Sequence, residues 1–279
     1  MHYIQNRQMK ILVLAKMDDH DKVVQDFLTN YLADDSEIHL LNVVKIPSEI
    51  PLQMNGEVIE FCTEYNLSKY YEQKTQHQEI LNKVFQGLKN ITTNCLIGNP
   101  LQLVKWYVKE HGIDLVVSGG HVTTHLEDIF SSSFANHLMQ SLSVPYLSVK
   151  GAHPQLKKIA IVREFVDPAK RSMDVIKKIQ KQFNAKLILV KINTPNSHMD
   201  ASELKLKMEL FAQLNDLTDA ELLTIEASDK ESAIHELISK HEIDLLTLGH
   251  IHRNGISTFL RGDLRSDILN HVNIPIYMY

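Results

Sequence analysis

The sequence predicts an α/β protein made of two Rossmann-like domains in tandem, each with a parallel sheet of five strands. Two observations support this fold class. Parts of the second half repeat parts of the first half in the same order, and within each half short apolar runs alternate with stretches of helical periodicity. Such alternation is typical of βαβ units, whose successive strands lie parallel in one sheet.

The internal repeat is clearest towards the end of each half. Residues 111–119 align with residues 241–249, and the same ungapped offset places Pro145 on Pro275. A repeat of this length contains several secondary-structure elements, so it indicates a duplicated domain.

The start of each half is repeated as well. An apolar run that begins at Lys10 resembles a run that begins at Lys158, and polar residues and an amphipathic pattern follow each run. The two halves meet at residues 150–154, a short segment that contains Gly and Pro. We therefore expect one domain over residues 1–150 and a second over residues 151–279.

Near-continuous apolar runs predict strands that are buried on both faces of a sheet. The strands expected in the first half are 11–14, 38–44, 93–97, 115–118 and 146–149, and those expected in the second half are 159–162, 187–192, 222–226, 245–248 and 276–278.

Helical periodicity fills the intervals between the strands. Two apolar stripes in the first half consist of Val23, Val24, Phe27, Leu28, Tyr31 and Leu32, and of Ile80, Leu81, Val84, Phe85 and Leu88. A further helix is expected over residues 100–111, ended by Gly112. In the second half, Asp167 followed by Pro168 predicts one helix start, and Ser228 with Glu231 predicts another through a capping box.

Composition excludes several classes of protein. The chain has 29 Lys and Arg against 34 Asp and Glu, a net charge of -5, and no long block of one sign, which argues against a nucleic-acid partner. Cys62 and Cys95 are far apart in the sequence, as expected in a reducing compartment. No apolar segment reaches the length of a membrane helix or a signal peptide. We expect a cytoplasmic protein with no membrane partner.

Each half contains an apolar strand after Ile-Asp, a Gly at its carboxyl end, a loop, a helix start with Ser or Gly, and a closing strand after Val-Pro or Ile-Pro. This arrangement resembles the universal stress protein family over both halves. The resemblance implies an adenine nucleotide alpha hydrolase-like fold. Nucleotide-binding members have Gly, two residues, Gly, nine residues, Gly and then Ser or Thr, because glycines let backbone amides approach phosphates at a helix N-terminus.

In the first half these family positions fall on Gly119, Val122, Ser132 and Ser133. The hydroxyl groups are able to hold a phosphate. The β-branched Val122 opposes a close ligand, so a structural helix cap is the favoured interpretation of the two serines.

In the second half the same positions fall on Gly249, His252, Gly262 and Asp263. Two glycines are kept, and a carboxylate replaces the hydroxyl. Asp263 would repel a triphosphate, but it is suited to cap its helix or to accept hydrogen bonds from a ribose.

The end of the first strand holds an Asp in nucleotide-binding relatives. This sequence has Lys16 there in the first half and Glu164 in the second. Glu164 is able to accept hydrogen bonds from a ribose, whereas Lys16 only donates them.

Histidines gather near both loops but do not predict a metal site. His250 and His252 lie beside Arg253, and the first half has a similar group in His121, His125 and His137. Neither group has a Cys or a further His at ligand spacing, so we expect polar loops and no metal.

Phosphate-binding, nucleophile-elbow and zinc-protease motifs are missing from the sequence, so it does not predict an enzyme. The leading hypothesis is a non-catalytic stress-response protein that binds a small ligand, ATP or another adenine nucleotide, in one half and more readily in the second. One alternative is a nucleotide-independent interaction scaffold. Another is a weak phosphohydrolase that uses Glu164 or Asp263 with a metal at His252.

The resemblance also implies how the protein associates. We expect the two domains to pair within the chain through strands 144–149 and 274–278, since pairing would cover two exposed sheet edges. A homodimer is the further expectation.

Overall fold

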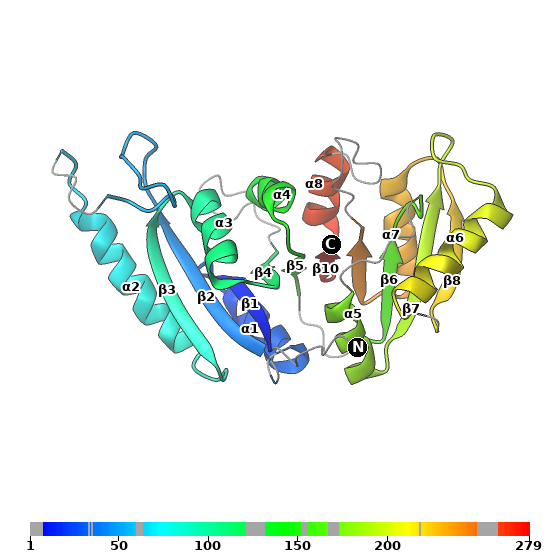
Figure 1. The fold of residues 1–279 in the computed structure, drawn as a ribbon, viewed down its shortest axis with the longest axis horizontal. Coiled ribbons are helices and arrows are strands. Elements are labelled where there is room, and N and C mark those ends of the chain that lie inside the picture. Colours follow the sequence, from blue (N-terminus) through cyan, green and yellow to red (C-terminus); the bar gives the residue numbers. More distant parts are fainter. Residues whose placement is uncertain are drawn as a thin grey trace, which may run out of the picture. The chain divides into compact units, whose positions relative to one another are not determined.

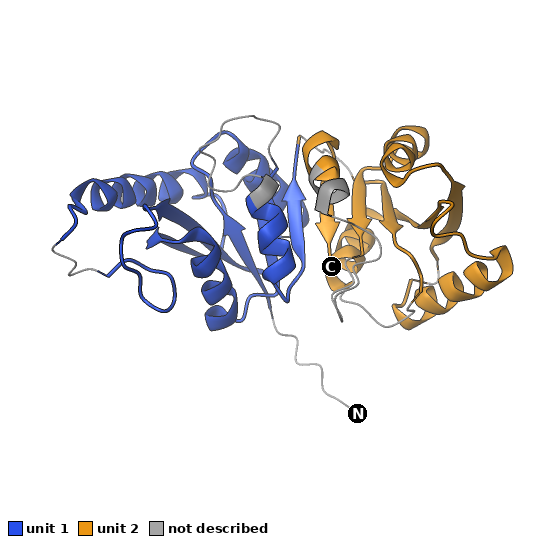
Figure 2. Ribbon diagram, turned by 90° about the horizontal axis from the view of Figure 1, so that it is seen from above, with its two compact units in different colours: residues 1–150 blue, residues 151–279 orange. Residues whose placement is uncertain are grey.

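The computed structural model describes residues 8–32, 34, 36–59, 64–120, 132–151, 156–166, 173–217, 219–249 and 262–279. The chain divides into two compact units, residues 1–150 and residues 151–279 (Figure 2). Each unit is an α/β structure with helices packed against a parallel sheet (Figure 1). The predicted fold class is confirmed.

Unit 1 follows the expected alternation of strands and helices. Its elements are β1 (Met9–Leu14), α1 (His20–Tyr31), β2 (Ser36–Lys45), α2 (Ser68–Val84), β3 (Ile91–Gly98), α3 (Pro100–His111), β4 (Leu115–Gly119), α4 (Ser132–Ser141) and β5 (Tyr146–Val149). The strand order is β3-β2-β1-β4-β5, and the strands are parallel.

Unit 2 repeats the same plan. Its elements are β6 (Lys158–Val162), α5 (Asp174–Phe183), β7 (Lys186–Asn193), α6 (Ala201–Leu214), β8 (Glu221–Glu226), α7 (Lys230–His241), β9 (Leu245–Leu248), α8 (Gly262–His271) and β10 (Ile276–Met278). The strand order is β8-β7-β6-β9-β10, again parallel.

The first strand of each unit lies at the centre of its sheet. Ile11, Leu12 and Val13 of β1 are completely buried, as are Ile159 and Ile161 of β6. Because both faces of these strands are covered, no alternation of polar and apolar residues is needed, and the apolar runs are continuous.

The Asp of each Ile-Asp pair holds the amino end of the central strand. Asp114 Oδ2 accepts a hydrogen bond from the Lys10 N–H at 2.9 Å, and Asp244 Oδ2 accepts one from the Lys158 N–H at 2.9 Å. These bonds join β1 to β4 and β6 to β9. The repeated Asp therefore helps to fix the pairing of these strands at their amino ends. The glycines lie at the carboxyl ends, on the opposite edge of the sheet.

Helix α3 begins and ends where the sequence predicts. Asn99 Oδ1 accepts a hydrogen bond from the Gln102 N–H at 3.1 Å, Pro100 occupies the first turn, and Gly112 has φ 61°, a left-handed conformation that favours glycine. The second apolar stripe was partly wrong, because Ile80 of α2 is 40% exposed. The start predicted at Asp167 and Pro168 lies outside the described residues.

The capping box predicted at Ser228 was wrong by one residue. Asp229 is the N-cap of α7, since its backbone is extended and its Oδ1 accepts a hydrogen bond from the Ser232 N–H at 2.8 Å. Ser and Asp are both good N-caps, so sequence alone did not separate the two neighbours.

We expect Asp229→Ala to lower the free energy of unfolding by about 1 kcal/mol, because it removes the cap of α7. Ser228→Ala is the matched control, and we expect it to change the free energy by less than about 0.5 kcal/mol. Urea unfolding of the two variants measures the difference. A larger loss at Ser228 would contradict the assignment.

Candidate functional site

The order of strands reverses at the same place in both units. The chain continues from β1 to β2 in one direction across the sheet and from β4 to β5 in the other. The connections from β6 to β7 and from β9 to β10 also run in opposite directions. In open parallel sheets, ligands bind beyond the carboxyl ends of strands at such a switch point. Gly119 ends β4 and Gly249 follows β9, so both predicted glycines lie at this edge.

Gly119 allows the start of α1 to lie against the end of β4. A Cβ atom at this position would be 2.8 Å from the Cβ of His20. Packing therefore requires a glycine here whether or not a ligand binds. Ser132 and Ser133 lie in the first turn of α4, but their side chains are outside the described part of the structure, as is Val122.

Asp21 fixes the loop between β1 and α1. Its Oδ1 accepts a hydrogen bond from the Lys16 N–H at 2.9 Å, and its Oδ2 accepts one from the Met17 N–H at 2.8 Å. Burial raises the pKa of the Asp21 carboxyl to about 6 although the two N–H donors lower it. No motif in the sequence points to this residue, which has the appearance of an ordinary acidic residue in a first helical turn.

Lys150 brings a buried positive charge to the same edge of unit 1. It is 4% exposed, and a Cβ atom on Gly120 would lie 2.3 Å from its Cγ. Burial and the nearby charge of Lys16 lower the pKa of Lys150 to about 8. Two lysines at this edge suit an anionic group.

In unit 2, Gly249 lets two side chains approach the end of β9. A Cβ atom at Gly249 would lie 3.2 Å from the Cβ of Arg163 and 3.2 Å from Tyr279 Oη. Arg163 is buried, and its guanidinium carbon lies 4.2 Å from the centre of the Phe211 ring. This arginine directly precedes Glu164, and no motif in the sequence points to it.

Glu164 lies between two lysines rather than facing an open site alone. Its Oε2 is 2.7 Å from Lys191 Nζ and its Oε1 is 2.5 Å from Lys230 Nζ. Lys191 is completely buried and also donates hydrogen bonds to the carbonyl oxygens of Ile192 at 2.8 Å and Ser197 at 3.0 Å. A lysine inside the apolar run of β7 was the signal in the sequence that would have revealed this group.

The structure brings Glu164 and Gly249 to neighbouring strand ends, because Val162 of β6 pairs with Leu248 of β9. Gly262 and Asp263 lie in the first turn of α8, with the Asp263 side chain outside the described part. His252, with His250 and Arg253, also lies outside it.

Among the described residues, no group of three or more His, Cys, Asp or Glu is placed to hold a metal ion. Within the same residues, no helix combines the length and apolar character that crossing a membrane requires.

Several solved structures share the fold over almost the whole chain. A universal stress protein from Archaeoglobus fulgidus superimposes with a TM-score of 0.68 at 12% identity, covering 98% of this chain and 96% of that one. A candidate universal stress protein from Pseudomonas aeruginosa gives 0.59 at 16% identity, covering 98% and 93%. The cytoplasmic domain of a prokaryotic cation chloride cotransporter gives 0.51 at 12% identity, covering 98% and 95%. The superpositions establish a shared fold. At such low sequence identity they do not show a shared activity.

Comparison of sequences gives the family. No curated protein matches the chain. The universal stress protein family model matches twice, at residues 9–150 and again at residues 155–279, and so confirms the resemblance in both halves. The chain therefore belongs to the universal stress protein family, as a member with two copies of the domain in tandem.

Proposed function

We propose that this protein is a non-catalytic stress-response protein that binds an adenine nucleotide at the carboxyl edge of unit 2, between β6 and β9. The observation that supports this best is the buried charge at that edge. Among the described residues at that edge, the buried Arg163 and Lys191 and the partly buried Lys230 are positive, and the buried Glu164 is negative. A net positive charge with limited access to water attracts an anion such as phosphate.

Unit 2 is the better candidate because it keeps Gly249 and Gly262 at the family positions, whereas unit 1 keeps only Gly119. Asp263 opposes this choice. Two like charges at about 4 Å in a partly dry site cost on the order of 4 kcal/mol. A monophosphate or an uncharged ligand would be disfavoured less than ATP.

Glu164 is still able to serve a ribose in this proposal. Each carboxylate oxygen has more than one acceptor site, so an oxygen that binds a lysine ammonium group can also accept a hydroxyl donor. Lys191 and Lys230 would hold the carboxylate in place and offset its charge.

The alternatives make different predictions. A scaffold would bind partners without nucleotide. A phosphohydrolase would release phosphate from ATP, and both carboxylate oxygens of Glu164, one of its candidate residues, already contact lysines. Domain pairing through strands 144–149 and 274–278, a homodimer and a cytoplasmic location stay predictions.

Calorimetric titration with ATP tests the proposed site. We expect Asp263→Ser to strengthen ATP binding at least about tenfold, because it removes a repelling charge, and Gly262→Val to abolish it by filling the space of a phosphate. No phosphate release is expected.

Ser133→Ala is the matched variant in unit 1 and is expected to leave ATP binding unchanged. If Asp263→Ser gives no gain while Ser133→Ala weakens binding, the nucleotide site lies in unit 1. Binding of ATP to neither unit would favour the scaffold, and steady phosphate release would favour the phosphohydrolase.

A further inference from the structure

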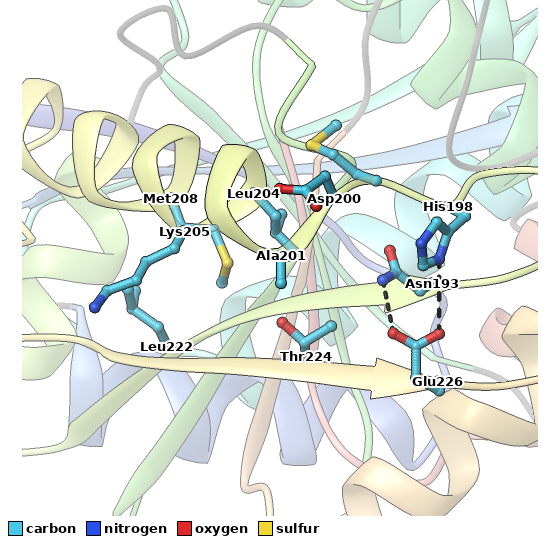
Figure 3. A pocket seen from close by; sticks show the side chains of 11 residues that line it. Asn193, His198, Asp200, Ala201, Leu204, Lys205, Met208, Leu222, Thr224 and Glu226 are labelled. Carbon is cyan, nitrogen blue, oxygen red and sulfur yellow. Dashed lines mark hydrogen bonds and ion pairs between the residues drawn. The ribbon is translucent and has the colours of Figure 1, made fainter.

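A hollow of about 650 Å³ lies in unit 2 between the first turns of α6 and the strands β7 and β8 (Figure 3). One end is mainly apolar, with side chains of Leu204, Met208 and Leu222 in its wall. Lys205 also lines this end, but its side chain is largely exposed and pairs with Glu209 at 3.9 Å. The other end is polar and holds Asn193 and Glu226. The volume suits a small organic molecule.

Asn193 is the unusual residue in this hollow. It is the last residue of β7 and only 3% exposed. Its Nδ2 donates a hydrogen bond to Glu226 Oε1 at 2.7 Å, but its Oδ1 is buried and finds no partner among the described residues. Figure 3 shows the amide nitrogen turned towards Glu226 and the oxygen turned the other way. A buried acceptor without a donor destabilises the empty protein, and a donor from a ligand would remove that cost.

The geometry points to a binding site for a small organic ammonium ion with an apolar portion. Asn193 Oδ1 is an unused acceptor, and the Glu226 carboxylate supplies negative charge beside it. His198 Nδ1 forms a long ion pair with Glu226 Oε2 at 4.0 Å, beyond hydrogen-bond reach, so that carboxylate oxygen is still able to accept a hydrogen bond from a ligand. Leu204 and Met208 are buried in the wall that would receive the apolar portion.

This site is separate from the proposed nucleotide site. The hollow lies over β7 and β8, whereas the switch point lies between β6 and β9. Strand β7 contributes Asn193 to the hollow and Lys191 to the contacts of Glu164. The two ligands also differ in charge, since the end of the hollow at Asn193 and Glu226 suits a cation and the switch point suits an anion. An absence of ATP binding would therefore not affect this inference.

Calorimetric titration of the full chain with 2-phenylethylamine tests the site. We expect saturable binding with a dissociation constant of about 1 mM or below. Asn193→Leu should weaken it at least about tenfold by replacing the acceptor with an apolar group of similar size. Glu226→Gln should weaken it about threefold, since that carboxylate is largely exposed.

Leu206→Ala is the matched control, because Leu206 lies on the exposed side of α6 at 66% exposure and should not affect binding. The neutral 2-phenylethanol should bind more weakly than the amine, and ATP should not compete. Binding that does not saturate, or that survives both Asn193→Leu and Glu226→Gln, would overturn the inference. If Asn193→Leu does not fold, Glu226→Gln and the neutral probe decide it.

Discussion

Glu164→Ala is expected to lower the free energy of unfolding by about 3 to 5 kcal/mol, among the largest losses that a single polar substitution produces. The carboxylate of Glu164 contacts both Lys191 and Lys230. Its removal would leave the completely buried Lys191 ammonium group with its carbonyl acceptors but no opposite charge. Urea unfolding at neutral pH measures the loss.

The control for this variant is Glu203→Ala, which removes an ion pair to Lys207 on the exposed surface of α6. We expect a change below about 1 kcal/mol there, because water screens exposed pairs. Combining Glu164→Leu with Lys191→Met should recover most of the stability, since replacing a buried ion pair by apolar residues is often neutral or favourable. A loss at Glu164 no larger than that at Glu203 would show that the carboxylate is not needed to hold the lysines.

Lys150→Met is expected to stabilise the protein by up to about 3 kcal/mol at pH 7. This free energy follows from the Lys150 pKa, which is 10.5 in the unfolded chain and about 8 in the folded protein. The pKa is lower in the folded than in the unfolded state, so the unfolded state binds more protons between these two values. Stability of the wild type therefore rises with pH across that window, and the full cost is present below pH 8.

The measurement compares unfolding of wild type and variant from pH 7 to about pH 10.5, so that changes in other groups cancel. The advantage of the variant should shrink as the pH rises. Lys89→Met is the control, because Lys89 is exposed and follows α2. An advantage that does not change with pH would mean that the methionine gains stability by packing and not by removing a charge.

The sequence predicted the positions of the strands well, because most of them are apolar runs. The expectation that they are buried on both faces was wrong for the edge strands β3 and β8, which are only partly buried. It predicted α3 because Pro100 and Gly112 act locally. It placed the cap of α7 on Ser228 and not Asp229, since two suitable residues stood side by side and only the backbone conformation separates them.

The charged groups of the candidate site were harder to predict. Glu164 was recognised by its family position, but its contacts with Lys191 and Lys230 join the segment after β6 to β7 and α7. Arg163 and Lys150 were missed for a similar reason, since burial of a charged side chain depends on packing between distant segments. Local patterns in the sequence do not report such contacts.

The central position of β1 also affects how the protein is made. The bond from Lys10 to Asp114 joins residues 104 apart, and the bond from Lys158 to Asp244 joins residues 86 apart. Contacts over such separations form late, because closing a long loop costs entropy. The ribosome therefore makes the innermost strand of each sheet first. That strand lacks one of its two neighbours until β4, or β9 in unit 2, has been made. During that delay a nascent unit has an open apolar edge, the kind of surface that chaperones protect.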